Sequence, residues 1–515
     1  MFNKKEKIFI FGTGAGGRSF YKKFSRKYNV IGFIDNNVQR HGKRLFSKNI
    51  YPPSVLTVRS FDRVVIVSDY YVDICNQLKN EINIDEGKFR IFSAMDLRQR
   101  NFIEKMNSAL DASVNRLICS YDSVFSRFIF SLKYFFLSKT DDVELVSLDW
   151  LDQREDLCVY ILRDEKCSQS FGPKFVGSCQ RRVEIKLPKI SLYEFSNAQI
   201  CSVSRSILDP SGHIIVERVQ TALTDIADYS GGHLICHGNK MAIVRREDAI
   251  GMEKGIVISG NSETNYYHWM LEILPQFQFI NELPIKYSDY PILISAHSQK
   301  IPSIKKFIDI LNIKRDIVFL DSTSSYIIQS LLFINTPNNS IPNLKNQSNT
   351  KVNFSYVRKE SLVFLRDVAY QYFNIICHNE SRGKKRVFFA RKGIIRSYNQ
   401  DEIIQGLIKL NFLIVYMEDL SFEEQVILMS EASMIVGASG AAWTNLLFAQ
   451  EGTKALCWMA DKVGEASGFS NIAHFIGVDM DCIKYPVVAN DTRDLYSASY
   501  HIRPDVIFEW VDENS

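Results

Sequence analysis

The chain has 515 residues and a net charge of +4 at pH 7, with 46% hydrophobic and 23% charged residues. These are the values of an ordinary globular protein with about two to four domains. The charge is too small to indicate nucleic-acid binding, but it fits a protein that handles anionic small molecules or works near an anionic membrane. The ten cysteines include no C-x-x-C pair, which indicates free thiols in a reducing compartment rather than disulfides or zinc ligands.

Neither a targeting sequence nor a membrane span is predicted. The N-terminal sequence has no long apolar stretch before a cleavage site, so it does not resemble a signal peptide. The most apolar stretch, residues 125–137, is shorter than the roughly 18 residues of a membrane span and contains Arg127 and Lys133. We expect a buried helix there, with an interfacial helix as the alternative. The sequence therefore predicts a cytoplasmic protein and leaves peripheral attachment to the inner face of the membrane open.

Residues 1–97 show an alternation of strands and helices. Short apolar runs predict the strands, and this alternation indicates a parallel α/β sheet with helices on its faces. The predicted strands are residues 7–11, 30–34, 64–67 and 89–92, and the predicted helices are residues 17–27 and 69–82. Residues 98–185 follow as a predicted helical connector and mixed segment.

A glycine-rich turn follows the first predicted strand. Gly12, Gly14 and Gly17 have the G-x-G-x-x-G spacing that lets a backbone approach a phosphate at a helix N-terminus. Asp35 ends the second strand, where a carboxylate can accept a ribose hydroxyl. These residues predict a Rossmann-like nucleotide-binding module, and a scaffold of the same fold without a ligand is the alternative.

The stretch IFIFGTGAGG…NVIGFIDNN…FDRVVIVSDY of this module is similar to the N-terminal nucleotide-sugar-binding module of bacterial sugar acyltransferases. The resemblance covers about residues 6–95. It implies a UDP-sugar as the ligand. NAD stays open as a ligand but is not favoured, and the resemblance does not imply hydride transfer.

Two further α/β units follow, which we assign to residues 186–350 and 351–515. Each alternates apolar runs with helical patterns, and the Asn-, Pro- and Ser-rich stretch 335–351 separates them. Two such units predict two facing Rossmann-like lobes with a cleft between them. In the second unit, Ser421 and Glu424 have the spacing of a capping box at the start of a helix.

Residues 265–272, with the sequence NYYHWMLE, are the first candidate site of these two units. On a predicted helix over residues 266–280, His268 and Glu272 lie four residues apart and share one face. An imidazole beside a carboxylate can deprotonate an acceptor hydroxyl. Asn265, just before them, is assigned to donor binding. An ordinary His–Glu contact is the alternative, and because the spacing is not that of an H-E-x-x-H zinc site, we predict no metal.

A second candidate site lies in residues 351–515. Arg391 and Arg396 follow the strand predicted at 387–389, and their planar guanidinium groups suit a diphosphate. The basic residues at 382–386 precede this strand and are expected to be solvated. The turn after the strand predicted at 434–436 would present small residues and backbone N–H groups to a phosphate. Its candidate residues are Gly437, Ser439, Gly440, Ala441, Thr444 and Asn445.

Three segments together resemble the catalytic domain of glycosyltransferase family 61. They are NYYHWMLEILPQ, RVFFARKGIIRSYNQDEI and EDLSFEEQVILMSEASMIVGASGAAWTNLLFAQEGT, in this order. The resemblance covers about residues 190–490. It implies a two-lobed, metal-independent fold of the GT-B type, whose C-terminal lobe holds an activated-sugar donor. The family usually has His at the position of Ser439 and Asp at the position of Glu272.

We therefore expect a glycosyltransferase that moves a sugar, with inversion, from a nucleotide-sugar to a carbohydrate or lipid-linked glycan in capsular or surface-polysaccharide synthesis. Glu272 or His268 would take the acceptor proton, Arg391 and Arg396 would bind the leaving diphosphate, and no cofactor beyond the donor is required. Formation of a homo-oligomer stays open. Two other classes also stay open: an NAD-dependent or nucleotide-sugar-modifying enzyme that uses the N-terminal module, and a non-catalytic subunit of a polysaccharide assembly complex.

Overall fold

The computed structural model divides the chain into two compact units, Met1–Asp111 and Ala112–Ser515. It describes residues 5–67, 74, 77–85, 88–91, 140–202, 205–217, 229–245, 249–260, 262–322, 324–339, 351–375, 385–392, 396–487 and 498–515. The helical connector expected before residue 140, which includes residues 125–137, lies outside the described residues. The same holds for half of the helix expected at 69–82, of which only residues 74 and 77–82 are described, and for Arg382 and Lys384.

The first unit contains one six-stranded sheet in the order β3-β4-β2-β1-β5-β6. Neighbouring strands are parallel except in the β3–β4 hairpin. Ile8, Phe9 and Ile10 are all fully buried, so both faces of the central strand are covered, as is usual for a parallel sheet. The elements are β1 (Lys7–Phe11), α1 (Ala15–Phe24), β2 (Asn29–Ile34), β3 (Arg44–Leu45), β4 (Lys48–Tyr51), α2 (Val55–Val58), β5 (Arg63–Ile66) and β6 (Phe89–Ile91).

The glycines of the β1–α1 turn have different local environments. A Cβ atom on Gly17 would lie 1.9 Å from the carbonyl oxygen of Gly12, so Gly17 lets α1 start directly against the turn. Gly12 has a φ of +105°, a conformation that favours glycine. A Cβ on Gly14, by contrast, would meet nothing within 4 Å. The fold therefore requires glycine at positions 12 and 17 but leaves open space at position 14.

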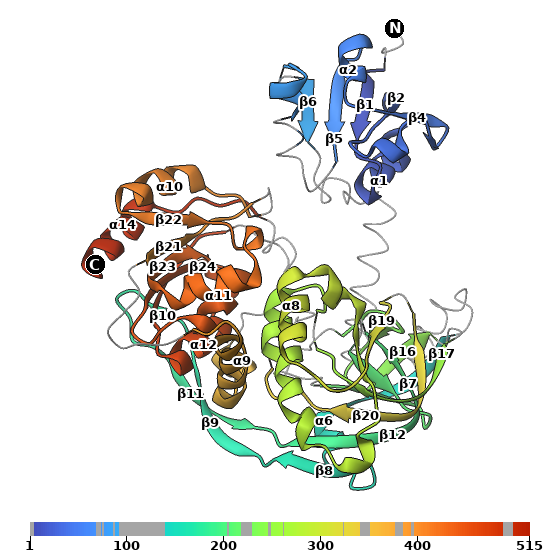
Figure 1. Cartoon of the computed structure of the whole chain (residues 1–515), viewed down its shortest axis with the longest axis vertical. Coiled ribbons are helices and arrows are strands. Elements are labelled where there is room, and N and C mark those ends of the chain that lie inside the picture. Colours follow the sequence, from blue (N-terminus) through green and yellow to red (C-terminus); the bar gives the residue numbers. More distant parts are fainter. Residues whose placement is uncertain are drawn as a thin grey trace. The chain divides into compact units, whose positions relative to one another are not determined.

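The second unit contains an eleven-stranded mixed sheet and a six-stranded parallel sheet (Figure 1). The larger sheet runs in the order β15-β16-β7-β14-β13-β12-β20-β17-β18-β19, with β8 paired to β12. Strands β20, β17, β18 and β19 are parallel to one another. The strands are β7 (Thr140–Ser147), β8 (Cys158–Arg163), β12 (Ile190–Cys201), β13 (Ser206–Leu208), β14 (His213–Val216), β15 (Leu234–His237), β16 (Met241–Arg245), β17 (Ile250–Val257), β18 (Ile292–Ser295), β19 (Ile317–Leu320) and β20 (Tyr326–Ile334).

The smaller sheet runs in the order β10-β25-β24-β23-β21-β22, and all its neighbouring strands are parallel. The strands predicted at 387–389, 412–416, 434–436 and 455–458 are confirmed. The capping box of Ser421 and Glu424 is also present at the start of α11. The elements are β10 (Lys174–Phe175), β21 (Lys385–Phe389), α10 (Gln400–Lys409), β22 (Phe412–Val415), α11 (Phe422–Ser430), β23 (Ala432–Ala438), β24 (Lys454–Ala460), α12 (Gly468–Ile476), β25 (Asp479–Tyr485) and α14 (Pro504–Glu513).

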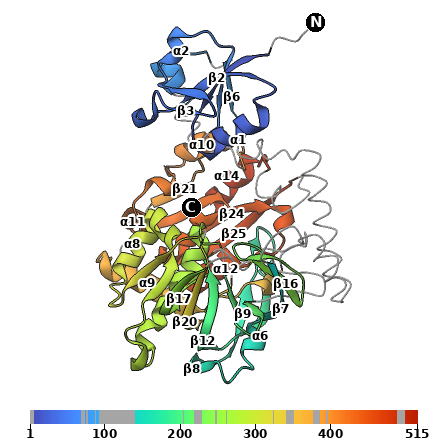
Figure 2. The same cartoon turned by 90° about the vertical axis from the view of Figure 1, so that its right-hand side faces the viewer.

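Residues 158–187 connect the two sheets of the second unit. Strand β8 joins the larger sheet, β10 joins the smaller one, and β9 (Lys166–Phe171) pairs with β11 (Arg182–Leu187) in an antiparallel hairpin between them. Figures 1 and 2 show β8 beside β12 at the lower edge of the unit, and Figure 1 shows β9 next to β11, nearer the smaller sheet. The part of the expected connector 98–185 that the structure describes therefore lies within the sheets, because its strands find partners that are distant in the sequence.

One hydrophobic cluster extends through both halves of this unit. It includes Trp269 from the helical segment after β17, Leu365 from α9 (Lys359–Tyr372) and Trp443 from the segment after β23, all fully buried. Helices α8 (Pro302–Ile310) and α9 lie on the side of the larger sheet that faces the smaller one (Figure 1). The two halves are thus packed through a common core.

The helix expected over residues 266–280 is present, but it is not a regular α-helix. An α-helical turn, Tyr266–His268, leads into a wider π-helical turn, Trp269–Ile273, and then a tighter 3₁₀ segment, Leu274–Glu282. Pro275 lies in the first turn of the last segment and has no N–H for a bond to the preceding turn. Such changes of pitch are frequent at functional sites.

The glycine environments lead to a paired test in the first unit. We expect Gly17→Ala to increase hydrogen exchange of the β1 amides by about 100-fold, since overpacking against a backbone atom costs about 1–3 kcal/mol. Gly14→Ala adds the same methyl group in open space and should leave exchange unchanged. Hydrogen-exchange mass spectrometry of the full chain measures both, and equal effects of the two variants would contradict the assignment.

Candidate functional site

His268 and Glu272 share one face of the helical segment that follows Asn265. Asn265 caps this segment, because its side chain accepts a hydrogen bond from the Tyr267 N–H at 2.9 Å. The Nδ1 atom of His268 lies 3.4 Å from Oε2 of Glu272. The Glu272 side chain is fully buried, whereas 14% of the His268 side chain is exposed. The imidazole is therefore the member of the pair that a substrate can reach.

Behind Glu272 lies an arginine that the sequence patterns did not single out. Arg205 is buried, with Nη1 3.4 Å from Oε2 of Glu272, and it also forms an ion pair with Glu217. Its Nη2 donates to Oγ1 of Thr336 at 2.8 Å, and Thr336 donates to Glu217 at 2.7 Å. Burial by itself lowers the pKa of Arg205, but the two carboxylates raise it above its ordinary value. The guanidinium thus stays charged and holds Glu272 in place.

No local signal could have found this network. Arg205 lies 67 residues before Glu272 and 131 residues before Thr336. Its backbone has a φ of +50°, which is uncommon for a residue other than glycine, asparagine or aspartate. Arg396 shows the same feature, with a φ of +56°.

The predicted arginines of the other half meet at one carbonyl group. Nη2 of Arg391 donates to the backbone oxygen of Ser439, and Nη1 of Arg396 donates to the same oxygen at 3.1 Å. The side chain of Gln400 fixes the backbone of Arg391 through two hydrogen bonds, of 2.7 and 3.0 Å. A Cβ on Gly440 would lie 2.8 Å from Nη2 of Arg391. The predicted cluster therefore forms at the carboxyl ends of β21 and β23, with glycine making room for a guanidinium.

The rest of the predicted turn supports this cluster from behind. A Cβ on Gly437 would lie 2.8 Å from Cβ of Phe389, so this glycine serves the packing of β23 on β21. A 3₁₀ segment, Ala441–Phe448, begins after Gly440 without a side-chain cap, and its Thr444 and Asn445 are buried. Its first turn, at Ala441, is the part that is partly exposed. Thr444 and Asn445 thus shape the turn from inside rather than line its surface.

One hydrogen bond joins the two candidate clusters. The hydroxyl of Tyr266 donates to Oδ1 of Asn445 at 2.8 Å. Tyr266 begins the segment that bears His268, and Asn445 lies in the segment that starts beside Ser439 and Arg391. The structure therefore connects the motif around His268 with the arginine cluster through Asn445, which the sequence assigned to donor binding.

An aromatic stack that the sequence did not predict lies near the arginines. The rings of Tyr398 and Tyr500 stack at a centroid distance of 5.1 Å, and those of Tyr485 and Tyr500 at 3.6 Å. Burial raises the pKa of Tyr485, and the positive charges of Arg396 and Arg391 partly oppose this rise. The stack supports the edge of the smaller sheet that bears the arginines. It could not be predicted from local patterns, because Tyr500 lies 102 positions after Tyr398.

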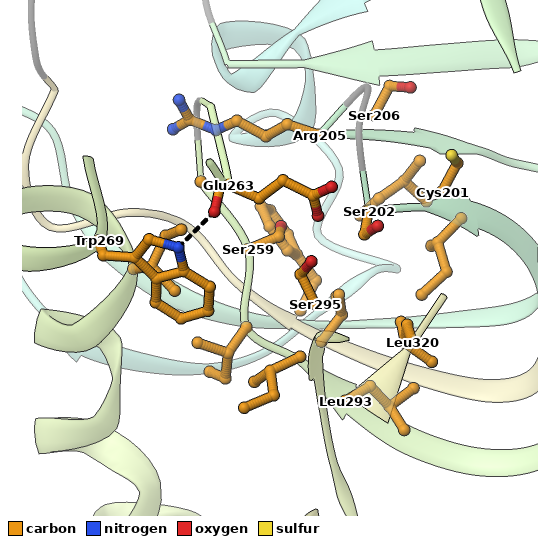
Figure 3. Close-up of a pocket in the computed structure, with 18 residues that line it drawn as sticks. Cys201, Ser202, Arg205, Ser206, Ser259, Glu263, Trp269, Leu293, Ser295 and Leu320 are labelled. Carbon is orange, nitrogen blue, oxygen red and sulfur yellow. Dashed lines mark hydrogen bonds between the residues drawn. The ribbon is translucent and has the colours of Figure 1, made fainter. Parts of the chain in front are cut away.

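A small pocket lies next to Arg205 in the larger sheet (Figure 3). The carboxylate of Glu263 and the hydroxyl of Ser295 point into it, while the indole N–H of Trp269 donates to the backbone oxygen of Glu263 at 2.6 Å. One oxygen of this carboxylate lies 3.2 Å from Nδ1 of His297. The pocket has room for about one water molecule. It is too small for a sugar, and we do not assign a substrate to it.

In the first unit, the carboxylate of Asp35 is occupied by groups of its own chain. One oxygen accepts hydrogen bonds from the backbone N–H and the hydroxyl of Thr13 and from Arg40 at 3.0 Å, and the other accepts from the Asn37 N–H at 2.9 Å. Partial burial acts to raise the pKa of Asp35, but these hydrogen bonds and the charge of Arg40 lower it below its ordinary value. A ribose hydroxyl would therefore have to share the Asp35 carboxylate with Arg40 or displace Arg40 from it.

Within the residues that the structure describes, no group of three or more His, Cys, Asp or Glu side chains could hold a metal ion. The helices described there include none that is long and apolar enough to cross a membrane.

Comparison with known proteins then shows what class of protein carries these clusters. A family model for sugar-transferring enzymes matches the central part of the second unit, and the protein is a glycosyltransferase. The model is that of Glycosyltransferase 61, and it covers residues 266–456. This range includes His268, Glu272, Arg391 and the turn around Ser439. Arg205, Glu217 and the strands before residue 266 lie outside it.

The remaining comparisons say less. Residues 4–90 match a model described as C2185-like, N-terminal, and no curated protein matches the chain. Among solved structures, UDP-D-quinovosamine 4-dehydrogenase from Vibrio fischeri aligns with 15% identity over 21% of this chain and 87% of its own, with a TM-score of 0.15. RSP, a Rex-family repressor, aligns with 13% identity over 23% of this chain and 65% of its own, with a TM-score of 0.17.

The contribution of Arg205 to the stability of the second unit can be measured. We expect Arg205→Met to lower the free energy of unfolding of the second unit by about 3–5 kcal/mol, because it leaves Glu217 and Glu272 buried without their counter-charge. Arg181→Met is the matched control: Arg181 is exposed and its partner Glu465 is partly exposed, so a change of only about 0–1 kcal/mol is expected.

Urea unfolding followed by tryptophan fluorescence measures both variants. All five tryptophans lie in the second unit, between Trp150 and Trp510, so the signal reports on that unit. Similar losses for Arg205→Met and Arg181→Met would show that the buried network does not stabilise the site.

Proposed function

We propose that the protein transfers a sugar from a nucleotide-sugar to a carbohydrate acceptor, with inversion, in the synthesis of a capsular or surface polysaccharide. The observation that carries this proposal is the pair of His268 and Glu272, a reachable imidazole backed by a buried carboxylate, within the region that matches glycosyltransferase 61. The acceptor is a free or lipid-linked glycan, and the donor is a UDP-sugar. The chemistry requires no metal or other cofactor.

In this proposal His268 is the general base, and Glu272 is a positioning residue. The carboxylate sits at Nδ1, so it favours the tautomer with a proton on Nδ1 and stabilises the imidazolium that forms when Nε2 takes the acceptor proton. The guanidinium of Arg205 contacts the same carboxylate oxygen. An inverting transfer then needs the acceptor hydroxyl on the face of the donor opposite to the leaving nucleotide.

Arg391 and Arg396 would stabilise the negative charge that develops on the leaving diphosphate. Each guanidinium group has five N–H donors, and the bonds to the Ser439 oxygen aim both groups at the same edge of the sheet. The backbone N–H of Ala441, at the start of the 3₁₀ segment, would add a partial positive charge beside the two arginines. Because the contact at Ser439 uses its backbone oxygen, a serine in place of the family's usual histidine keeps this arrangement.

We infer that the architecture is of the GT-B type, with the larger and smaller sheets as its two lobes. We further infer that the first unit is a Rossmann-like module that binds a second UDP-sugar through Gly12, Gly14 and Asp35. The switch in strand order beside β1 supports this inference, since ligands of open parallel sheets bind at such a point.

If His268 is the general base, its replacement should greatly lower turnover. We expect His268→Ala to lower kcat by about 10²–10⁴-fold with little change in donor KM, since general-base catalysis contributes about this factor. Glu272→Gln should retain the binding of substrates but lower kcat, because the imidazole loses the carboxylate that orients it. Initial rates across a panel of UDP-sugars measure this, with His297→Ala as the control. Full activity in His268→Ala would disprove the assignment.

The donor site predicts a change in donor affinity as well. We expect Arg391→Ala to raise donor KM and lower kcat/KM by at least about tenfold, because a charge-assisted contact to the diphosphate is lost. Arg391→Lys should not restore activity, since it lacks the planar fork. Lys392→Ala is the neighbouring control, because Lys392 is half exposed and paired with Asp419. Equal effects at positions 391 and 392 would count against the donor site.

A further inference from the structure

The first unit carries a strong local excess of positive charge. Residues 5–67 contain thirteen Lys and Arg residues but only three acidic ones, Glu6, Asp35 and Asp62, although the whole chain has a net charge of only +4. The rest of the chain is therefore acidic on balance. Such a contrast within one chain indicates that the basic part meets a polyanion.

Five of the lysines gather around one concave surface, which we call the basic face. Lys5, Lys7 and Lys48 line a pocket together with Tyr21, Ser25 and Tyr28. Lys22 lies over the ring of Phe46, which stacks on Tyr21, and Lys27 lies over the ring of Tyr28. The basic face thus consists of Lys5, Lys7, Lys22, Lys27 and Lys48 with aromatic rings between them.

The acidic residues of this segment neutralise little of the face. Asp35 is engaged by Arg40 and Thr13, and Glu6 forms an ion pair with Arg63. Asp62 lies near the start of β1 and accepts the backbone N–H of Lys7 at 2.7 Å. Within the described part of the unit, no carboxylate forms an ion pair with the ammonium group of Lys5, Lys7 or Lys48.

The basic face is separate from the candidate nucleotide site of this unit. It lies at the amino ends of β1 and β2, whereas Gly12 and Asp35 follow their carboxyl ends. The five residues of β1 separate the two edges by roughly 16 Å, at about 3.3 Å per residue. A ligand at the glycine turn would therefore leave the basic face free for another partner.

We propose that the basic face docks the protein on an anionic lipid surface, with lipid phosphates in the pocket between Lys5, Lys7 and Lys48. Lysines with long apolar stems and partly exposed aromatic rings are the side chains that suit the headgroup region of a bilayer. Several lysines near an anionic leaflet act together and lose their effect at high salt.

The full chain is tested with lipid vesicles. Co-sedimentation is measured with vesicles of phosphatidylcholine alone and with vesicles that contain about one third phosphatidylglycerol. We expect binding to the anionic vesicles only, and release at about 1 M NaCl, where the Debye length falls to about 3 Å. The triple variant Lys5→Glu, Lys7→Glu, Lys48→Glu should bind at least about tenfold more weakly, and the corresponding triple change to Gln should have an intermediate effect.

The control is the triple variant Lys300→Glu, Lys305→Glu, Lys314→Glu. These exposed lysines lie in the second unit. The control variant therefore has the same net charge as the triple Glu variant of the basic face, but its basic face is intact, and it should bind like the wild type. Unchanged hydrogen exchange of β1 shows that the variants of the basic face are folded. Equal binding of the two charge-reversed variants would overturn the proposal. So would binding of the wild type to duplex DNA without a preference for anionic vesicles.

Discussion

A buried arginine held between two carboxylates is the constraint on which the candidate catalytic pair depends. Removing one of these charges from water without its partner would cost several kcal/mol, so Arg205, Glu217 and Glu272 must remain together. They lie directly before β13, directly after β14 and in the π-helical turn after Asn265. The ion network therefore fixes the position of His268 relative to the larger sheet.

The arginine cluster in the other half depends on the geometry of a parallel sheet. The carboxyl ends of β21 and β23 lie side by side, so Arg391 and the Ser439 carbonyl meet although 48 residues separate them. The bond between Tyr266 and Asn445 and the shared hydrophobic core join this edge to the motif of His268. The two halves thus act as one packed unit rather than as two independently folded domains.

Much of the secondary structure could be predicted from local patterns. Four strands of the smaller sheet, β21 to β24, and the β1–α1 turn follow from short apolar runs, and the capping box at Ser421 follows from a glutamate three positions further on. The irregular helix after Asn265 could not be predicted in detail, because a change of pitch depends on tertiary packing around Trp269 as well as on Pro275. Strand β10 could not be assigned either, since its partner β25 lies far along the chain.

The sequence by itself determined the residue types and local spacing of the site: His268 four residues before Glu272, two arginines after a strand, and small residues in the following turn. The resemblance of three ordered segments to one glycosyltransferase family could also be recognised in the sequence. Only the tertiary structure decided that Glu272 is buried and His268 accessible, and that Arg205, Glu217 and Thr336 stand behind them. Burial and counter-charges depend on strands brought together across the fold, and no local pattern encodes which distant residues will meet.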